Sequence, residues 1–215
     1  MSATSTDKPP PSAPTVIEQV VLPGVHQLRS IRHDPSGNIL AGAGMDGDVH
    51  RFEQRFEGWY QLLSLGGHDA WVTQVRWHPS DSLLFSSDSW GQLQCTELFA
   101  EDPARRNIHW KHKTAHDGWI RDLAISPDGT RLATCGRDRK VRVWNTDGKL
   151  LATKDCPEDQ FAVSFAPCGG QVVHGGLKGH IALWDYGRNK TVREFDGSSF
   201  HTYHRIQDIG GLRTF

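Results

Sequence analysis

Four copies of one pattern account for most of this 215-residue chain. Each copy contains a proline in a polar turn, and successive prolines are 44, 48 and 40 residues apart: Pro35, Pro79, Pro127 and Pro167. An apolar alternation precedes each turn, and a short apolar strand, a tight turn and a second alternating strand follow it. Residues 126–144, SPDGTRLATCGRDRKVRVW, show this order in the third copy. Strict alternation between turns is typical of strands with one buried face, so we predict an all-β chain.

Repeats of about 40–45 residues with several strands each are typical of propeller blades. The third copy, AHDGWIRDLAISPDGTRLATCGRDRKVRVWN, resembles a WD-repeat unit with Asn145 in place of the closing Asp. The fourth copy keeps the dipeptide Trp184-Asp185. The resemblance covers residues 16–215 and implies a WD-repeat β-propeller, with four-stranded antiparallel blades set radially around a channel. It also implies that each outer strand follows the Trp, as KLLATKD (149–155) and KTVREF (190–195) do.

The copies are expected near residues 25–62, 66–104, 114–154 and 156–196, which is fewer than the seven blades usual in this family. A fifth copy is expected to begin after about residue 205, because LRTF (212–215) aligns with the start of the third copy. We therefore predict about four blades in an open arc, able to self-associate through its open edges. In a closed four-bladed alternative, TVIEQVVL (15–22) pairs with the fourth blade. Residues 1–15, rich in Pro, Ser and Thr, are predicted to be a disordered leader.

A half-buried Trp needs an acceptor for its single N–H. The resemblance implies a network that supplies one in the third copy through His116, Asp138, Thr134 and Trp144. The other copies keep fewer members: His68 and Ser86 in the second, Asp46 in the first, Trp184 in the fourth. Other residues stand at the remaining positions: Trp90 and Thr96 in the second, Gly24, Gly42 and Phe52 in the first, Cys156, His174 and Lys178 in the fourth. We expect a complete network in the third blade alone, and we expect the other blades to rely on packing.

Three motifs suggest chemistry, and each has a structural interpretation. Thr134, His116 and Asp138 imitate a nucleophilic triad, but an indole engages the hydroxyl and no oxyanion hole is visible. Residues 42–47, GAGMDG, match G-x-G-x-x-G, but an alternating strand follows them where a dinucleotide site needs a helix. Residues 109–116, HWKHKTAH, are predicted to form a solvated basic loop, with a metal or phosphate site or an acidic docking partner as alternatives. We predict no enzyme activity, no metal and no cofactor.

Two tryptophans follow their histidines by three residues, Trp71 in HDAW and Trp119 in HDGW. The resemblance places this position at the mouth of the innermost strand, on the rim where partners bind; burial in the core is the alternative. Arg137 and Met45, next to the turn Asp positions, are expected on the same rim. Exposed aromatic side chains are typical interface anchors. We predict a non-catalytic scaffold that binds a protein or peptide through this rim.

The alternative function is a propeller enzyme or a small-ligand sensor that uses the central channel. A pocket at the channel mouth that gathers two or more carboxylates or histidines would favour it. Composition bears on the partner, since 24 basic residues against 25 acidic ones favour neither nucleic acid nor an anionic membrane. The four cysteines form no C-x-x-C pair, which favours a reducing, cytoplasmic setting.

Overall fold

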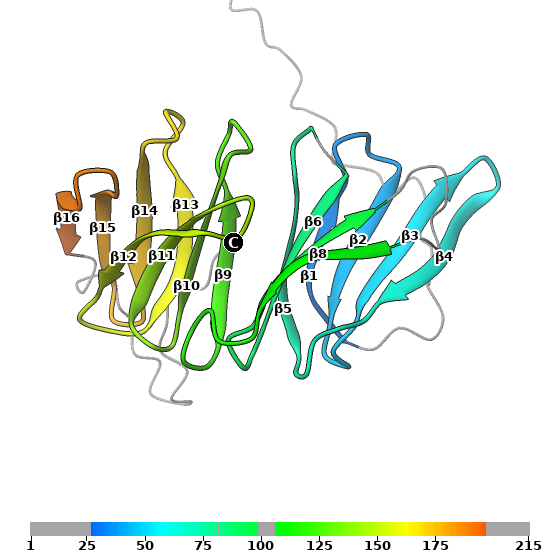
Figure 1. Cartoon of the computed structure of the whole chain (residues 1–215), viewed down its shortest axis with the longest axis horizontal. Helices are drawn as coiled ribbons and strands as arrows, with labels where there is room; N and C mark the ends of the chain where they lie inside the picture. The colour runs from blue at the N-terminus through cyan, green and yellow to red at the C-terminus, as the bar shows by residue number, and fades with distance from the viewer. Residues whose placement is uncertain (1–26, 81, 99–105, 197–215) are drawn as a thin grey trace, which may run out of the picture.

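The computed structural model describes residues 27–80, 82–98 and 106–196, and its strands are all antiparallel (Figure 1). They form four four-stranded sheets, here called blades one to four in chain order. Blade one contains β1 (Leu28–His33), β2 (Ile39–Gly44), β3 (Val49–Arg55) and β4 (Gly58–Leu65). Blade two contains β5 (Val72–Trp77), β6 (Leu83–Asp88), β7 (Leu93–Leu98) and β8 (Arg106–His112). Blade three contains β9 (Ile120–Ile125), β10 (Arg131–Gly136), β11 (Lys140–Asn145) and β12 (Leu150–Asp155). Blade four contains β13 (Gln160–Phe165), β14 (Gln171–Gly176), β15 (His180–Asp185) and β16 (Lys190–Asp196).

Each blade is a meander in which consecutive strands pair, as the sequence repeat predicts. The expected outer strands after Trp144 and Trp184 are β12 and β16. The second copy extends beyond its expected end near residue 104, because its outer strand is β8. The prediction of a solvated loop at residues 109–116 is therefore wrong for residues 109–112. Ring contacts and hydrogen bonds explain the difference, since Trp110 Nε1 donates to the Thr146 carbonyl and His112 Nε2 to that of Gly148.

The polar turn between the first two strands of blade three is held by one carboxylate. Asp128 accepts hydrogen bonds from the Ser126 and Thr130 hydroxyls and from the Thr130 amide. These bonds lower the pKa of Asp128 to about 2. Gly129 has a φ of 73°, and a Cβ there would lie 2.6 Å from His78 Nε2 of blade two. His78 Nε2 also lies 2.9 Å from the Gly129 carbonyl, so the turn contacts the neighbouring blade directly.

The hydrophobic core lies between the blades. One cluster joins blades one and two, a second joins blades two and three, and a third joins blades three and four. In blade three, Leu132 packs toward blade two while its chain neighbour Ala133 packs toward blade four, and both are fully buried. Alternation along the strand therefore places apolar side chains on both faces of each inner blade, and each blade depends on its neighbours to bury them.

The four described blades do not close into a ring. Figure 1 shows them as a fan, with β4 of blade one and β16 of blade four at opposite ends. Val173 of blade four occupies the place of Ala133, since the two pair with Leu183 and Val143 respectively, yet Val173 is 38% exposed. The leader, TVIEQVVL and the start of a fifth copy lie outside the described residues, and self-association stays a prediction.

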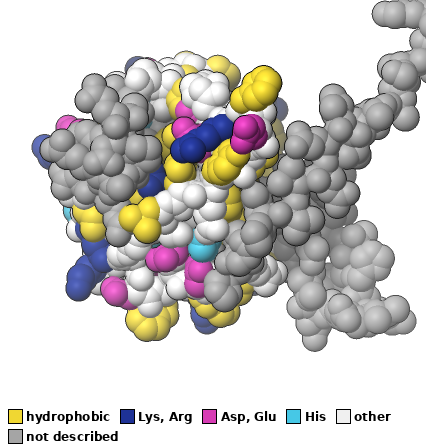
Figure 2. Space-filling view, turned by 90° about the vertical axis from the view of Figure 1, so that its right-hand side faces the viewer, with side chains coloured by type: hydrophobic (Ala, Val, Ile, Leu, Met, Phe, Trp, Pro, Cys, Tyr) yellow, Lys and Arg dark blue, Asp and Glu magenta, His cyan; other side chains and the backbone are white. Residues whose placement is uncertain are grey.

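The end of the fan at blade one carries charges of both signs. Acidic and basic side chains lie among scattered apolar ones wherever described residues are visible on this face (Figure 2). Among the residues that the structure describes, no helix is long and apolar enough to cross a membrane.

Polar contacts join the innermost strands of successive blades. Arg76 of β5 forms an ion pair of 3.0 Å with Asp122 of β9, and Asp122 also accepts a 3.0 Å hydrogen bond from the Val163 amide of β13. Burial raises the pKa of Asp122, against the opposing charge of Arg76. Burial also lowers the pKa of Arg76 to about 10. Asp122 thus links three blades through one carboxylate.

We predict that Asp122→Ala destabilises the protein by about 2–3 kcal/mol, because it leaves the mostly buried Arg76 guanidinium without its counter-charge and the Val163 amide without its acceptor. Urea denaturation followed by fluorescence measures the change. Asp117→Ala, at an exposed carboxylate, is the matched control and should change stability by less than about 0.5 kcal/mol. Equal losses in the two variants would contradict the role of Asp122.

Candidate binding site on the rim

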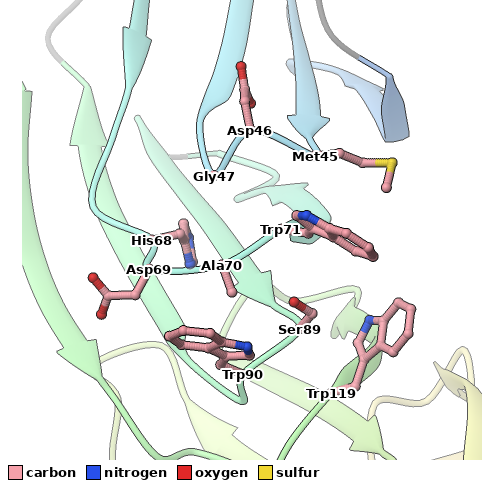
Figure 3. Close-up of a pocket in the computed structure, with 10 residues that line it drawn as sticks. All are labelled: Met45, Asp46, Gly47, His68, Asp69, Ala70, Trp71, Ser89, Trp90 and Trp119. Carbon is pink, nitrogen blue, oxygen red and sulfur yellow. The ribbon is translucent and has the colours of Figure 1, made fainter.

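A hollow of about 600 Å³ opens where four segments meet on one rim of the fan (Figure 3). The segments are the turn after β2, the segment before β5, the turn after β6 and the residue before β9. The lining residues are Met45, Asp46 and Gly47, then His68, Asp69, Ala70 and Trp71, then Ser89 and Trp90, and finally Trp119. All of these come from loops, so what fixes the loops also fixes the site.

A buried network fixes the loop before β9. The Trp144 indole can only donate, so the Thr134 hydroxyl, 3.0 Å away, accepts from it. The Thr134 hydrogen then points to His116 Nε2 at 2.8 Å, which leaves Nδ1–H to donate to Asp138 at 2.8 Å. Arg142 donates to the other Asp138 oxygen at 2.7 Å. The donors of Trp144, Thr134 and His116 each meet an acceptor, which is what a buried polar network requires. Arg142 Nη1 also lies 2.8 Å from His116 Nδ1, and the Asp138 carboxylate accepts from both residues.

Blade two contains a polar network that comparison of the four copies did not predict. His68 Nδ1 lies 3.1 Å from Asp88 Oδ2, and His68 Nε2 lies 2.7 Å from the Ser86 hydroxyl. Both the His68 and Asp88 side chains are fully buried. Asp88 stands two residues before Trp90, at the end of β6, yet it reaches the histidine. The expectation that blade two relies on packing alone is therefore wrong.

Asp88 also shapes the turn that carries Trp90. Its Oδ1 accepts hydrogen bonds of 2.9 Å from the Trp90 and Gln92 amides. Gly91 has a φ of 90°, and a Cβ there would lie 2.1 Å from the His116 carbonyl. The turn thus packs directly on the loop of blade three and needs glycine at this position.

Blades one and four hold their turns with other polar groups. In blade one, Asp46 Oδ2 lies 2.9 Å from His50 Nε2, and the Ser64 hydroxyl lies 3.2 Å from His50 Nδ1. In blade four, Glu158 accepts from the Lys178 and His180 amides. Trp184 is fully buried and donates to Asn189 Oδ1 at 3.2 Å, with no hydroxyl partner. Polar support is thus present in all four blades, through different residues.

The two predicted rim tryptophans lie side by side. Trp71 and Trp119 pack edge to face, with ring centroids 6.3 Å apart. Trp71 is 46% exposed, whereas Trp119 and Met45 are half-buried, and all three line the hollow. Arg137 is exposed next to them, and its amide donates to the Trp119 carbonyl at 2.9 Å. The alternative that Trp71 is buried in the core is therefore wrong.

Trp90 is the lining residue that sequence reasoning treated only as a defect in the network. It is 69% exposed and lies on the opposite side of Ala70 from Trp71 (Figure 3). The signal that could have found it is its type, because an aromatic residue at the tip of a polar hairpin turn has no packing role there. Two arginines were also missed: Arg121 and Arg29 place their Cζ atoms 3.8 and 5.1 Å from the Trp119 ring centroid.

The motifs that suggested chemistry have structural roles here. The Thr134 hydroxyl is fully buried within its network. GAGMDG spans the end of β2 and a turn, and the strand β3 follows it. Within the described parts of the chain, no group of three or more His, Cys, Asp or Glu side chains is arranged to hold a metal ion.

The family model described as WD domain, G-beta repeat matches residues 59–95 and 110–145. Each matched segment begins in the outer strand of one blade, β4 or β8, and ends in the third strand of the next, β7 or β11. This is the offset between repeat and blade that the resemblance implied. These two segments are WD repeats. The four sheets of the chain have the architecture of WD-repeat β-propeller blades.

Curated proteins similar to these WD repeats include three longer chains. The small ribosomal subunit protein RACK1 of Drosophila melanogaster is 30% identical over 135 residues, 60% of this chain and 39% of that protein. The methylosome protein WDR77 of Xenopus laevis is 25% identical over 181 residues, 79% of this chain and 54% of that protein. The pre-mRNA-splicing factor cwf17 of Schizosaccharomyces pombe is 29% identical over 160 residues, 74% of this chain and 45% of that protein. The chain thus spans between 39% and 54% of their lengths.

We predict that Asp88→Ala destabilises this WD-repeat chain by about 1–3 kcal/mol, because His68 and two turn amides lose a buried acceptor. Urea denaturation measures the loss, and Lys149→Ala, at an exposed side chain, provides the control. An Asp88→Ala variant as stable as Lys149→Ala would restore the original expectation that packing alone holds blade two.

The blade three network predicts a pH-dependent stability. Burial lowers the pKa of His116 below 6.5, and although burial alone would raise that of Asp138, the bonds from His116 and Arg142 lower it below 3.8. Because both folded pKa values are depressed, their stabilisation is present above the unfolded values and is lost as the pH falls. We therefore expect the free energy of unfolding to fall as acidification passes about pH 6.5 and to fall further below about pH 4.

An Asp138→Asn variant isolates the second of these groups. Its deficit in unfolding free energy relative to wild type should be largest at about pH 7 and should shrink at about pH 3, because the wild type then begins to lose the same contribution. Urea denaturation across this range provides the measurement. A deficit that grows on acidification would contradict the assignment.

Proposed function

We propose that this chain is a non-catalytic interaction module that presents the rim hollow to a peptide segment of a partner protein. WD-repeat proteins are known as protein-interaction scaffolds. The observation that carries the proposal is the exposure of Trp71 and Trp90 on either side of one hollow, with Met45 and Trp119 beside them. Aromatic side chains at such positions supply most of the binding energy in many interfaces.

The rigidity of the hollow supports the same function. Trp90 lies in the turn that Asp88 holds, and Met45 lies beside Asp46, which is bonded to His50. The Trp119 loop rests on the His116 network. A binding site whose loops are already fixed loses less conformational entropy when a partner binds.

The rival function, an enzyme or a small-ligand sensor, gains some support from composition, because Asp46, Asp69 and His68 all line the hollow. Their arrangement argues against it. His68 is fully buried and engaged with Asp88 and Ser86. The Asp46 and Asp69 carboxylates extend away from the tryptophans in Figure 3 and do not converge on one point. Converging polar groups are what a small-molecule site needs.

A cytoplasmic setting is part of the proposal. All four cysteines are free, and Cys95, Cys135 and Cys156 are buried. Burial raises the pKa of Cys95 to about 12 and that of Cys156 to about 11, which leaves them as unreactive thiols. Buried thiols without disulfides fit a reducing compartment.

The test is a selection of binders from a random peptide library on the wild-type chain, followed by affinity measurements on variants. We expect Trp71→Ala and Trp90→Ala each to weaken binding of the selected peptides by about tenfold or more. Trp59→Ala is the matched control, because Trp59 lies half-buried on β4, outside the hollow. Selected peptides that bind both rim variants as tightly as the wild type, with folding intact by circular dichroism, would reject the site.

A further inference from the structure

Three arginines from separate segments gather around Trp119, next to the hollow. Arg29 is on β1, Arg121 is on β9, and Arg137 is in the turn after β10. The Arg29 and Arg121 guanidinium groups stack on the Trp119 ring, and the Arg121 group also lies 4.8 Å from the Phe161 centroid. Arg29 and Arg137 are exposed and Arg121 is half-buried, so the cluster is accessible.

The positive charge of this cluster is only partly balanced by the residues that the structure describes. Burial lowers the pKa of Arg121, and the charges of Arg29 and Arg137 lower it further. Asp159 acts in the opposite direction but forms no ion pair with Arg121 in the described chain. The Arg121 Nε is buried without a hydrogen-bond partner.

Other arginines nearby are treated differently. Arg76 is paired with Asp122, and Arg142 is paired with Asp138. In the described parts of the chain, no carboxylate lies within ion-pair distance of Arg29, Arg121 or Arg137. Like charges held together without a counter-charge destabilise the free protein, and an oxyanion placed among them would relieve the repulsion.

We infer that Arg29, Arg121 and Arg137 bind an acidic side chain of the partner peptide, whose apolar neighbour occupies the hollow beside Trp71. The inference rests on the proposed function and names the chemistry of its partner. Guanidinium groups suit both carboxylates and phosphates, so the side chain is glutamate, aspartate or a phosphorylated residue. Stacking on Trp119 and Phe161 holds two of the guanidinium groups in place before the anion arrives.

Stacked aromatics and arginines also suit single-stranded nucleic acid. Two observations favour an acidic peptide. The net charge of the chain is −1, and the lining of the hollow includes Asp46 and Asp69. A nucleic-acid strand carries a phosphate on every unit along its whole length and would meet these carboxylates, whereas a protein partner can offer a short acidic segment at the arginines alone.

The experiment uses three short probes on the whole chain: hexaglutamate, hexalysine and hexathymidine, with NMR detection of the indole N–H signals. We expect hexaglutamate to bind, to shift the Trp119 indole signal and to bind more weakly as salt is added. Arg29→Gln and Arg137→Gln, both at exposed sites that should fold normally, are each expected to weaken binding by about three- to tenfold. A glycine peptide with one central phosphoserine or one central glutamate distinguishes the two sources of the oxyanion.

The matched control is Arg193→Gln. Arg193 is exposed on β16 with its Cζ 4.8 Å from the Phe195 ring, so it makes the same kind of contact away from the cluster. Equal binding of hexaglutamate to Arg193→Gln and to Arg137→Gln would overturn the inference. So would a failure of hexaglutamate to bind the wild type, or tighter binding of hexalysine or hexathymidine.

The library-selected peptides separate this inference from the proposed function. If they bind Trp71→Ala poorly but Arg29→Gln and Arg137→Gln normally, the acidic preference is wrong and the interaction module stands. If they bind Trp71→Ala as tightly as the wild type, the proposed function itself fails, whether or not hexaglutamate binds.

Discussion

Burial of each blade by its neighbours is the constraint on which the rest of this structure depends. A four-stranded sheet with apolar side chains on both faces cannot be stable alone in water, because one face or the other would stay exposed. Leu132 and Ala133, adjacent in the chain, are covered by different blades. The innermost strands must then lie close enough for Asp122 to meet Arg76 and the Val163 amide from opposite sides.

Close packing of blades places the loops of different blades against one another. The turn at Gly91 presses on the His116 carbonyl, and the polar turn at Gly129 meets His78. These loops need firm anchors, and the chain supplies them with several chemistries: an aspartate in the turn, an aspartate at the strand end, or a glutamate from the preceding loop. What stays the same is a carboxylate that accepts the amides of a hairpin turn.

The anchored loops create a rim with two chemically distinct parts. Trp71, Trp90 and Met45 line a hollow whose lining also includes the Asp46 and Asp69 carboxylates. Arginines surround Trp119 beside it, without carboxylate partners of their own among the described residues. Such a surface favours a ligand that is itself apolar at one point and acidic at the next, which gives it both affinity and direction.

The sequence by itself determined the strands, the turns and the blade pattern, which follow from alternation, turn chemistry and repeat spacing. The third-blade network and the rim position of Trp71 followed from the resemblance of these repeats to WD repeats. Tertiary structure decided the rest. Asp88 lies two residues before the position that the network Asp occupies in the third copy, and yet it reaches His68. Residues 109–112 form a strand because blade three covers Trp110 and His112. Arg29 meets Trp119 across ninety positions of sequence, because only the geometry of packed blades brings such distant residues together.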